Sequence, residues 1–197
     1  MGKDLYIRPF FTRDKMFNIE VPDGEPKAFI TICDRGKDGS ITGKSTVAAE
    51  IHELMNVRHA LKLYREFGAE RFERFAAWLN PKAPAGLLSF VHTNGKRTTT
   101  WGLSMREAKD GSRSFSVFVT QAEGGKKENR SFPIDPGLYL LLERYMERAL
   151  EAVEENSLEW ARARRQELFE GTEREEEPPA LSPPPRRPVR NPFTPGA

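Results

Sequence analysis

An internal repeat is the feature of this sequence that most constrains its fold. When the chain is aligned with itself at an offset of 86 residues, identical residues face each other without a gap. The identical pairs include Phe29 and Phe115, Thr12 and Thr98, Ser45 and Ser131, Leu54 and Leu140, and Arg58 and Arg144. Apolar positions also keep the same phase in both copies. Self-similarity at a fixed period predicts a duplicated supersecondary unit.

The first copy is predicted to contain short strands followed by a long amphipathic helix. Alternating apolar and aromatic residues over 5–11, 16–21 and 27–33, separated by turn residues, predict an antiparallel meander. A fourth, shorter strand is predicted over 41–44. Ser45 or Thr46 then caps a helix that ends at Gly68.

The second copy repeats this order after a linking helix over 69–79. Strands are predicted over 87–94, 98–106, 113–121 and 130–134. Asp135 has the residue type of an N-cap, and Pro136 suits the first helical position. The following helix runs to Phe169, with a break expected near Asn156.

These elements predict an α+β fold of two repeated units, each with about four antiparallel strands and a long helix. The predicted boundaries are 1–68 for the first unit, 69–85 for the connector, 86–170 for the second unit and 171–197 for a disordered tail. The tail is rich in Pro, Glu and Arg and has too few apolar residues to fold.

Charge is distributed unevenly along the 197 residues. The formal net charge is +2, but residues 86–134 carry eight Lys or Arg against four Asp or Glu. Such a basic segment favours a polyanionic partner. The single Cys33 excludes an internal disulfide, and no apolar run reaches the ~18 residues of a membrane helix. We therefore expect a cytoplasmic protein that does not contact membranes.

Strand periodicity divides each predicted sheet into a core face and an open face. The repeat alignment assigns Phe29, Thr31 and Cys33 to the core together with Phe115, Val117 and Val119. It leaves Ile30 and Ile32 on the open face of the first copy.

In the second copy the open face carries Thr100, Ser104, Arg106 and Ser116, with Phe118 exposed among them. An aromatic ring among hydroxyls and cations suits unpaired bases and phosphates. The alternative is an ordinary solvated sheet face, because Ser and Thr are frequent in exposed strands.

Two motifs resemble catalytic or metal sites without meeting their requirements. Residues 38–46 resemble a phosphate-binding loop, but Asp38 stands where that loop needs Gly. The helical run 52–56 resembles a zinc-protease motif, but Asn56 replaces the second His ligand. We expect no catalytic residue, no metal and no cofactor. If the protein hydrolysed a nucleoside triphosphate and Lys44→Ala abolished that activity, the expectation of no catalytic residue would be wrong.

The pattern from Leu103 through residues 130–135 to Leu141 resembles a superfamily of single-stranded nucleic-acid-binding proteins. This superfamily includes Whirly proteins, PUR repeats and coactivators of the positive-cofactor type. The resemblance implies a Whirly-like pseudo-dimer, in which two sheets and two long helices pack about a pseudo-two-fold axis and nucleic acid lies across the sheets. Glu20 stands where the second copy has Arg106, which departs from a uniformly basic surface.

The predicted function is binding of single-stranded DNA, with RNA as the other possible ligand, at low sequence specificity. The expected contacts are Arg8, Lys15, Lys27, Lys44, Lys96, Arg97, Thr100, Ser104, Arg106, Arg113, Ser116, Phe118 and Arg130. The alternative is a transcription or replication factor that binds a polymerase or another protein through the same fold and tail. Pro192 and Phe193 would be the anchor of that tail, which resembles the tail of bacterial single-strand-binding proteins. The sequence leaves open whether the chain forms a homodimer through its long helices.

Overall fold

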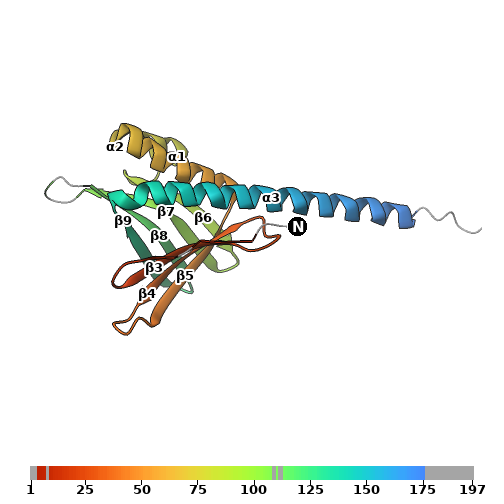
Figure 1. Cartoon of the computed structure of the whole chain (residues 1–197), viewed down its shortest axis with the longest axis horizontal. Helices are drawn as coiled ribbons and strands as arrows, with labels where there is room; N and C mark the ends of the chain where they lie inside the picture. Colours follow the sequence, from red (N-terminus) through yellow and green to blue (C-terminus); the bar gives the residue numbers. More distant parts are fainter. Residues whose placement is uncertain (1–3, 8, 108–109, 111–112, 176–197) are drawn as a thin grey trace, which may run out of the picture. The chain divides into compact units, whose positions relative to one another are not determined.

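The structure is a computed structural model, and it describes residues 4–7, 9–107, 110 and 113–175. These residues form two antiparallel sheets and three helices (Figure 1). The first sheet contains β1 (Leu5–Tyr6), β2 (Phe10–Phe11), β3 (Lys15–Val21), β4 (Ala28–Arg35) and β5 (Ile41–Ala49). The second contains β6 (Leu87–Asn94), β7 (Arg97–Glu107), β8 (Arg113–Glu123) and β9 (Lys126–Ile134). The helices are α1 (Ile51–Phe67), α2 (Ala69–Leu79) and α3 (Pro136–Glu175).

The chain divides into two compact units, Met1–Arg162 and Ala163–Ala197. The described part of the second unit is the end of α3. Both sheets, α1, α2 and the candidate site belong to the first unit.

Strand order confirms the predicted duplication. The first sheet has the order β1-β3-β4-β5, with β2 also paired to β3, and the second has the order β6-β7-β8-β9. Pairing of β4 with β5 sets Ile32 opposite Ser45, and pairing of β8 with β9 sets Phe118 opposite Ser131. These residues are 86 apart, but Ile32 points into the core and Phe118 points outward, so the offset of 86 does not match the faces of the two strands. The predicted α+β fold with two repeated strand and helix units is therefore correct.

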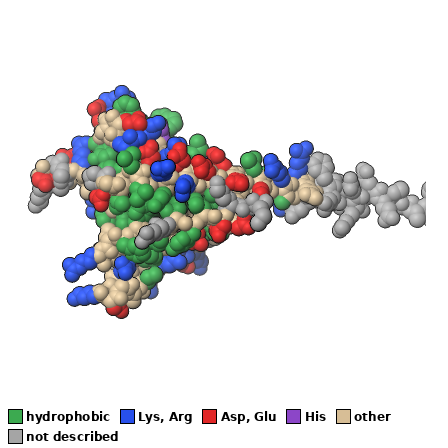
Figure 2. All heavy atoms as spheres, viewed as in Figure 1, with side chains coloured by type: hydrophobic (Ala, Val, Ile, Leu, Met, Phe, Trp, Pro, Cys, Tyr) green, Lys and Arg blue, Asp and Glu red, His purple; other side chains and the backbone are tan. Residues whose placement is uncertain are grey.

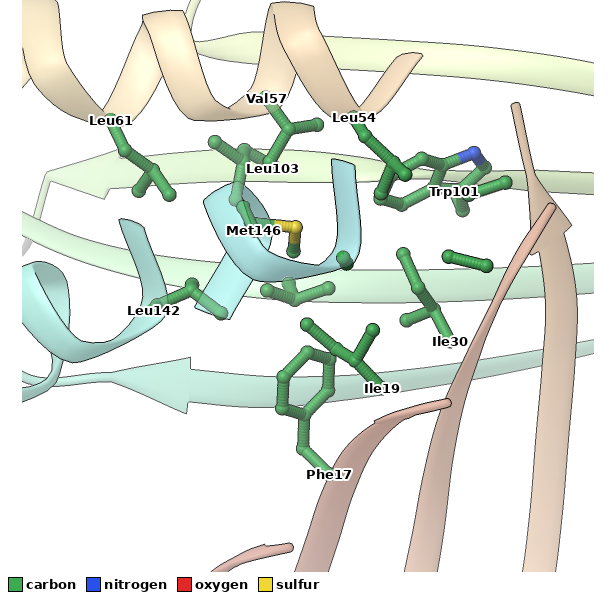
Figure 3. Close-up of a cluster of buried hydrophobic side chains, with 14 of the residues drawn as sticks. Phe17, Ile19, Ile30, Leu54, Val57, Leu61, Trp101, Leu103, Leu142 and Met146 are labelled. Carbon is green, nitrogen blue, oxygen red and sulfur yellow. The ribbon is translucent and has the colours of Figure 1, made fainter. Parts of the chain in front are cut away.

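One hydrophobic core joins the inward faces of both sheets to the helices (Figure 3). Ile19 and Ile30 come from the first sheet, Trp101 and Leu103 from the second, and Met146 from α3, and all five are fully buried. α3 is tied to α1 by ion pairs, as between Arg65 and Glu143, and lies against the first sheet on its other side. Neither sheet buries its inner face by itself.

The predicted faces of β4 are wrong. Ile30 and Ile32 belong to the core cluster between the sheets, whereas Phe29, Thr31 and Cys33 lie on the opposite face of the strand, where Cys33 is fully buried as predicted and Thr31 is also buried. The register places Ile32 opposite the core residue Phe17. A gapless alignment of the two copies misplaces this strand by one residue, and a one-residue shift moves every side chain to the other face.

The predicted core residues of the second copy agree with the structure, whereas one pair of repeat positions in the helices differs in burial. In the second copy, Phe115, Val117 and Val119 are fully buried core residues, as predicted. The helices do not follow the repeat, because Leu54 is fully buried while Leu140 is 61% exposed.

The predicted start of the first helix is also wrong. Ser45 and Thr46 lie inside β5, which continues to Ala49. Ser45, Val47 and Ala49 are buried at alternate positions, and this is the period of a strand. The N-cap of α1 is Glu50, which forms a capping box with Glu53.

The third helix begins as predicted and continues past its predicted break. The backbone N–H of Leu138 donates to Oδ1 of Asp135 at 3.0 Å, so Asp135 caps α3. At Asn156 the helix is unbroken, and the buried side-chain amide donates to the carbonyls of Pro22 and Glu25, each at 3.1 Å. Asn156 therefore anchors α3 to the turn between β3 and β4.

The ends of two other predicted segments can be compared with the structure. α2 has the predicted bounds, and α3 continues to Glu175, beyond the boundary expected at residue 171. The remaining predicted tail, residues 176–197, lies outside the described part of the chain. Among the helices that the structure describes, none combines the length and apolar character needed to cross a membrane.

Candidate nucleic-acid interface

Each sheet has an outward face that no helix of the core covers. In the second sheet this face is made of small and hydroxyl side chains, and we call it the hydroxyl face. Its members are Leu87, Ser89, Val91, Thr93, Thr98, Thr100, Gly102, Ser104, Arg106, Ser114, Ser116, Phe118, Thr120, Ala122, Lys127, Asn129, Ser131 and Pro133. No outward position on these four strands is occupied by Asp or Glu.

The hydroxyl face contains a shallow hollow of about 190 Å³. Its lining residues are Leu87, Ser104, Arg106, Ser116, Phe118, Thr120, Asn129 and Ser131. The structure thus brings together four predicted site residues, Ser104, Arg106, Ser116 and Phe118. Thr100, a fifth, is paired with Thr120 at the rim of the hollow.

Phe118 faces outward as predicted, but it is not exposed. Only 8% of the residue is accessible, so its ring is not free to stack on a base. Its cross-strand neighbours are Gly102 and Ser131. Because both are small, the large ring fills the space between them and forms part of the floor of the hollow.

The outward face of the first sheet has different chemistry, and we call it the aromatic face. Its members are Tyr6, Phe11, Met16, Asn18, Glu20, Phe29, Thr31, Cys33, Arg35, Thr42, Lys44, Thr46 and Ala48. Tyr6 is 61% exposed and Phe11 55% exposed. The guanidinium carbon of Arg35 lies 5.0 Å from the centre of the Phe11 ring, which is a cation–π contact.

A polar row crosses the aromatic face. Asn18 lies opposite Thr31, which lies opposite Thr46, and the two Thr hydroxyls are 3.0 Å apart. Oδ1 of Asn18 is buried and has no hydrogen-bond partner among the described residues. An acceptor in this state is costly to leave unpaired.

Solved structures provide the comparison for this arrangement. WHY3 from Arabidopsis thaliana matches with a TM-score of 0.50 and 12% sequence identity, over 83% of this chain and 98% of WHY3. The fold is Whirly-like. WHY1 from the same plant gives a TM-score of 0.49 at 10% identity, over 76% of this chain and 91% of WHY1. The plant transcriptional regulator PBF-2 gives a TM-score of 0.49 at 11% identity, over 82% of this chain and 87% of PBF-2. No protein-family model and no curated protein sequence matches this chain.

Within this Whirly-like fold the predicted cations fall into two groups. Lys15, Lys27 and Arg113 form ion pairs with Asp34, Glu50 and Glu107, at 2.9, 3.4 and 3.3 Å. The exposed side chains of Lys44, Lys96, Arg97 and Arg106 have no carboxylate partner among the described residues. The second group is therefore the better candidate for phosphate contacts. Arg8 lies outside the described residues, as do Pro192 and Phe193.

Arg130 connects the two sheets rather than facing outward. Its Nε donates to Oδ2 of Asp34 on β4 at 2.9 Å, and its Nη1 donates to Oγ of Ser45 on β5 at 2.7 Å. A Cβ at Gly43 would lie 2.5 Å from Nη2 of Arg130, so a larger residue at this strand position would displace the guanidinium. Arg130 is thus an anchor between the sheets, which the sequence alone did not indicate.

The carboxyl of Asp34 is held in its charged form by two cations. Partial burial raises its pKa, but hydrogen bonds and charge from Lys15 and Arg130 together outweigh that effect and lower the pKa below the usual value. Charge neutralisation at this point lets the two sheets approach each other closely.

The two motifs that resemble other sites have structural roles. Lys44 and Ser45 lie within β5, so residues 38–46 do not form a loop that leads into a helix. In the helical run 52–56, the buried side chain of Glu53 accepts hydrogen bonds from Nε1 of Trp101 at 3.1 Å and from Nε2 of His92. Glu53 thereby fixes the start of α1 to the second sheet. In the described part of the chain, no group of three metal-binding side chains is placed to hold an ion.

The aromatic face contains functional candidates that the sequence analysis missed. Tyr6, Phe11 and Arg35 were assigned no role, and Phe29 was assigned to the core because the alignment of the copies turned β4 the wrong way. A signal was present in the sequence. Ile30 and Ile32 are more apolar than Thr31 and Cys33, so the hydrophobic pattern of this strand alone favours the isoleucines as core residues.

Proposed function

We propose that this protein binds single-stranded DNA with little sequence preference and without catalysis. The observation that carries the proposal is the composition of the two outward faces. Exposed aromatic rings and unpaired cations lie on or beside these faces, whereas other cations are neutralised by carboxylates. A Whirly-like fold supports the same assignment through the resemblance described above.

Stacking is assigned to the aromatic face. Tyr6 and Phe11 expose more than half of their surface, and the contact with Arg35 holds Phe11 in place. Stacking of a base on an aromatic side chain is tolerant of sequence, because every base has a flat π-face. Bases in a duplex are already stacked on each other, so this mode selects single strands.

Phosphate and sugar contacts are assigned to the unpaired cations and to the hydroxyl face. Lys44 lies on the aromatic face, Arg106 on the hydroxyl face, and Lys96 and Arg97 at the turn between β6 and β7. Hydroxyl side chains commonly bind phosphate and sugar oxygens, which position a strand without reading its sequence. The absence of carboxylates from the outward positions of β6 to β9 avoids repulsion of the phosphates.

A titration of labelled oligonucleotides tests the proposal. Fluorescence anisotropy is measured with single-stranded DNA, duplex DNA and single-stranded RNA, at about 50 and about 200 mM salt. We expect the single strands to bind more tightly than duplex, and log affinity to fall with log salt at about −0.7 per phosphate contact. Equal affinity for duplex and single strand would contradict the proposal. The RNA arm determines whether the ligand class extends beyond DNA.

A matched pair of arginine variants distinguishes contact residues from paired ones. Arg106 has no carboxylate partner in the described chain, whereas Arg113 is bound to Glu107 at 3.3 Å. Arg106→Ala is expected to weaken binding and to reduce the salt slope by about 0.7, the value of one contact. Arg113→Ala is expected to change the slope much less. Equal effects of both variants would indicate a general charge effect and would remove the assignment of Arg106.

A second candidate function is a regulatory factor of transcription or replication that acts by binding another protein. The observation that favours it is an exposed apolar surface on α1 and α2, which neither sheet face explains. DNA affinity that depends weakly on salt would favour this second function over the first.

A further inference from the structure

Helices α1 and α2 expose apolar side chains on the side opposite their packed face. Leu54, Val57 and Phe72 are fully buried, but Met55 is 54% exposed and Trp78 73% exposed. A Trp this accessible is unusual, because its large apolar surface favours burial. Exposed apolar patches on soluble domains commonly mark interaction sites.

The exposed side chains form a ladder across the two helices. The rings of His59 and Phe75 meet edge to face at 4.9 Å, and Phe75 stacks on Trp78 at 6.1 Å, both distances between centroids. A hollow of about 320 Å³ lies beside this ladder. Its lining is Met55, Asn56, Arg58, His59, Lys62 and Phe75, and together with Trp78 we call it the α1–α2 groove.

The lining side chains of the α1–α2 groove include cations and no carboxylate. Its titratable lining residues are Arg58, His59 and Lys62. Arg58 is bound to Glu147 of α3, whereas Lys62 has no carboxylate partner among the described residues. Figure 2 shows hydrophobic side chains at the surface over α1 and α2, with Lys and Arg side chains beside them. The groove therefore combines apolar surface with positive charge.

We propose that the α1–α2 groove binds an acidic segment of a partner protein that carries an aromatic or large aliphatic side chain. The apolar side chain packs against Met55, Phe75 and Trp78, and the acidic residues lie beside Lys62, the lining cation that no described carboxylate neutralises. Buried Trp and Arg side chains are the residues that most often dominate the energy of protein interfaces. This inference does not depend on the proposed DNA-binding function, because the groove lies on the helices and not on either outward sheet face.

A protein segment fits this groove better than nucleic acid does. The apolar part of the lining includes Met55, whose flexible thioether adapts to varied side chains. Phe75 is partly buried between His59 and Trp78, so its ring has little free face on which a base could stack.

Three short fluorescent peptides test the groove on the full-length protein. The first alternates Asp and Glu with one Phe and one Leu, the second replaces the acids by Lys, and the third replaces Phe and Leu by Ala. We expect only the first to bind well. Trp78→Ala and Lys62→Glu are expected to weaken it about tenfold or more, the size of effect typical of an interface anchor.

Trp160→Ala is the matched control, because Trp160 is 56% exposed and is not part of the groove. It should leave the affinity for the acidic peptide unchanged. Melting temperatures of all variants establish that they fold. The proposal is overturned if no peptide binds, if the Lys peptide binds equally well, or if Trp78→Ala has no effect.

Two further outcomes would assign the groove to another occupant. Displacement of the acidic peptide by excess single-stranded DNA, with loss of DNA affinity in Lys62→Glu, would make the groove a nucleic-acid contact. A dimer in sedimentation that Trp78→Ala dissociates would make the occupant a second copy of this chain. Both outcomes overturn the proposal, whereas a monomer that binds the peptide in the presence of DNA supports it.

Discussion

The two sheets have the same strand order at their centre and opposite chemistry on their outward faces. On the first sheet, the side chains of Tyr6 and Phe11 are exposed, whereas on the second sheet the side chain of Phe118 is buried in the floor of the hollow. Hydroxyl groups cover the second sheet, and apolar side chains dominate much of the first. Duplication of a unit therefore preserved the pairing of strands while the solvent-facing residues diverged.

The short N-terminal strands explain part of this difference. β1 and β2 both pair with β3 and place Tyr6 and Phe11 at the edge of the first sheet. The second sheet has four strands and no counterpart of these two additions among its described residues. We interpret the two faces as complementary, with base stacking on the first sheet and phosphate and sugar contacts on the second.

The largest expected effect is a difference in stability between variants of the buried Phe118 and of the exposed Phe11. Phe118→Ala should lower the free energy of unfolding by about 3 kcal/mol, because it empties a filled position between two small neighbours. Phe11→Ala should lower it by less than about 1 kcal/mol, the value of a surface cation–π contact. Chemical denaturation measures both. A loss in Phe118→Ala no larger than that in Phe11→Ala would contradict the difference between the faces.

For the affinity for single-stranded DNA we expect the larger losses in variants of the exposed rings. Tyr6→Ala and Phe11→Ala are each expected to weaken binding of single-stranded DNA by about 1 to 3 kcal/mol, the range for one stacked base. Anisotropy titrations at fixed salt provide the measurement. Phe67→Ala is the control, because Phe67 is also an exposed aromatic residue but lies at the end of α1. If all three variants lose the same affinity, the aromatic face has no special role.

A smaller effect is expected at the contact between the two sheets. Lys15 and Arg130 lower the pKa of Asp34, so its charged form stabilises the fold at neutral pH. A carboxyl with a lowered pKa contributes stability above its unfolded value of about 4 and loses it as the pH falls through its folded value. Asp34→Asn should therefore melt below the parent at pH 7, with a gap that closes under acidic conditions.

Asp23→Asn is the control for this pH dependence. Asp23 is an exposed carboxylate in the turn between β3 and β4, away from the Arg130 contact. We expect its melting temperature to follow that of the parent across the pH range. A gap for Asp34→Asn that persists in acid would show that its effect is packing rather than charge.

Local patterns in the sequence predicted the elements well. Alternating apolar residues gave the second-copy strands, and Pro136 after Asp135 marked the start of α3. The same reasoning failed where one residue of register decided the outcome. The repeat forced Phe29 onto the core face, although Ile30 and Ile32 are the more apolar pair.

The candidate site was less predictable than the fold, because ion pairing depends on residues distant in sequence. Arg113 and Arg106 look equivalent in the chain, yet the first is paired with Glu107, whereas the second has no carboxylate partner among the described residues. Arg130 meets Asp34 only after the two sheets pack together. Exposure of Phe118 depended on the size of its neighbours on adjacent strands, which the sequence does not place in register by itself.

The smallest expected effect concerns residues 176–197. The hydrophobic core contains no residue beyond Val153 among those the structure describes, and neither outward face includes a residue beyond β9. Deletion of 176–197 should therefore leave the melting temperature and the affinity for single-stranded DNA nearly unchanged. If the pair Pro192 and Phe193 recruits a protein, the same deletion should abolish capture of that protein from the native host, and so should Phe193→Ala alone. A large drop in melting temperature would show instead that residues 176–197 pack on the fold. A loss of DNA affinity comparable to that of Phe11→Ala would show that the two sheet faces do not account for binding without the tail.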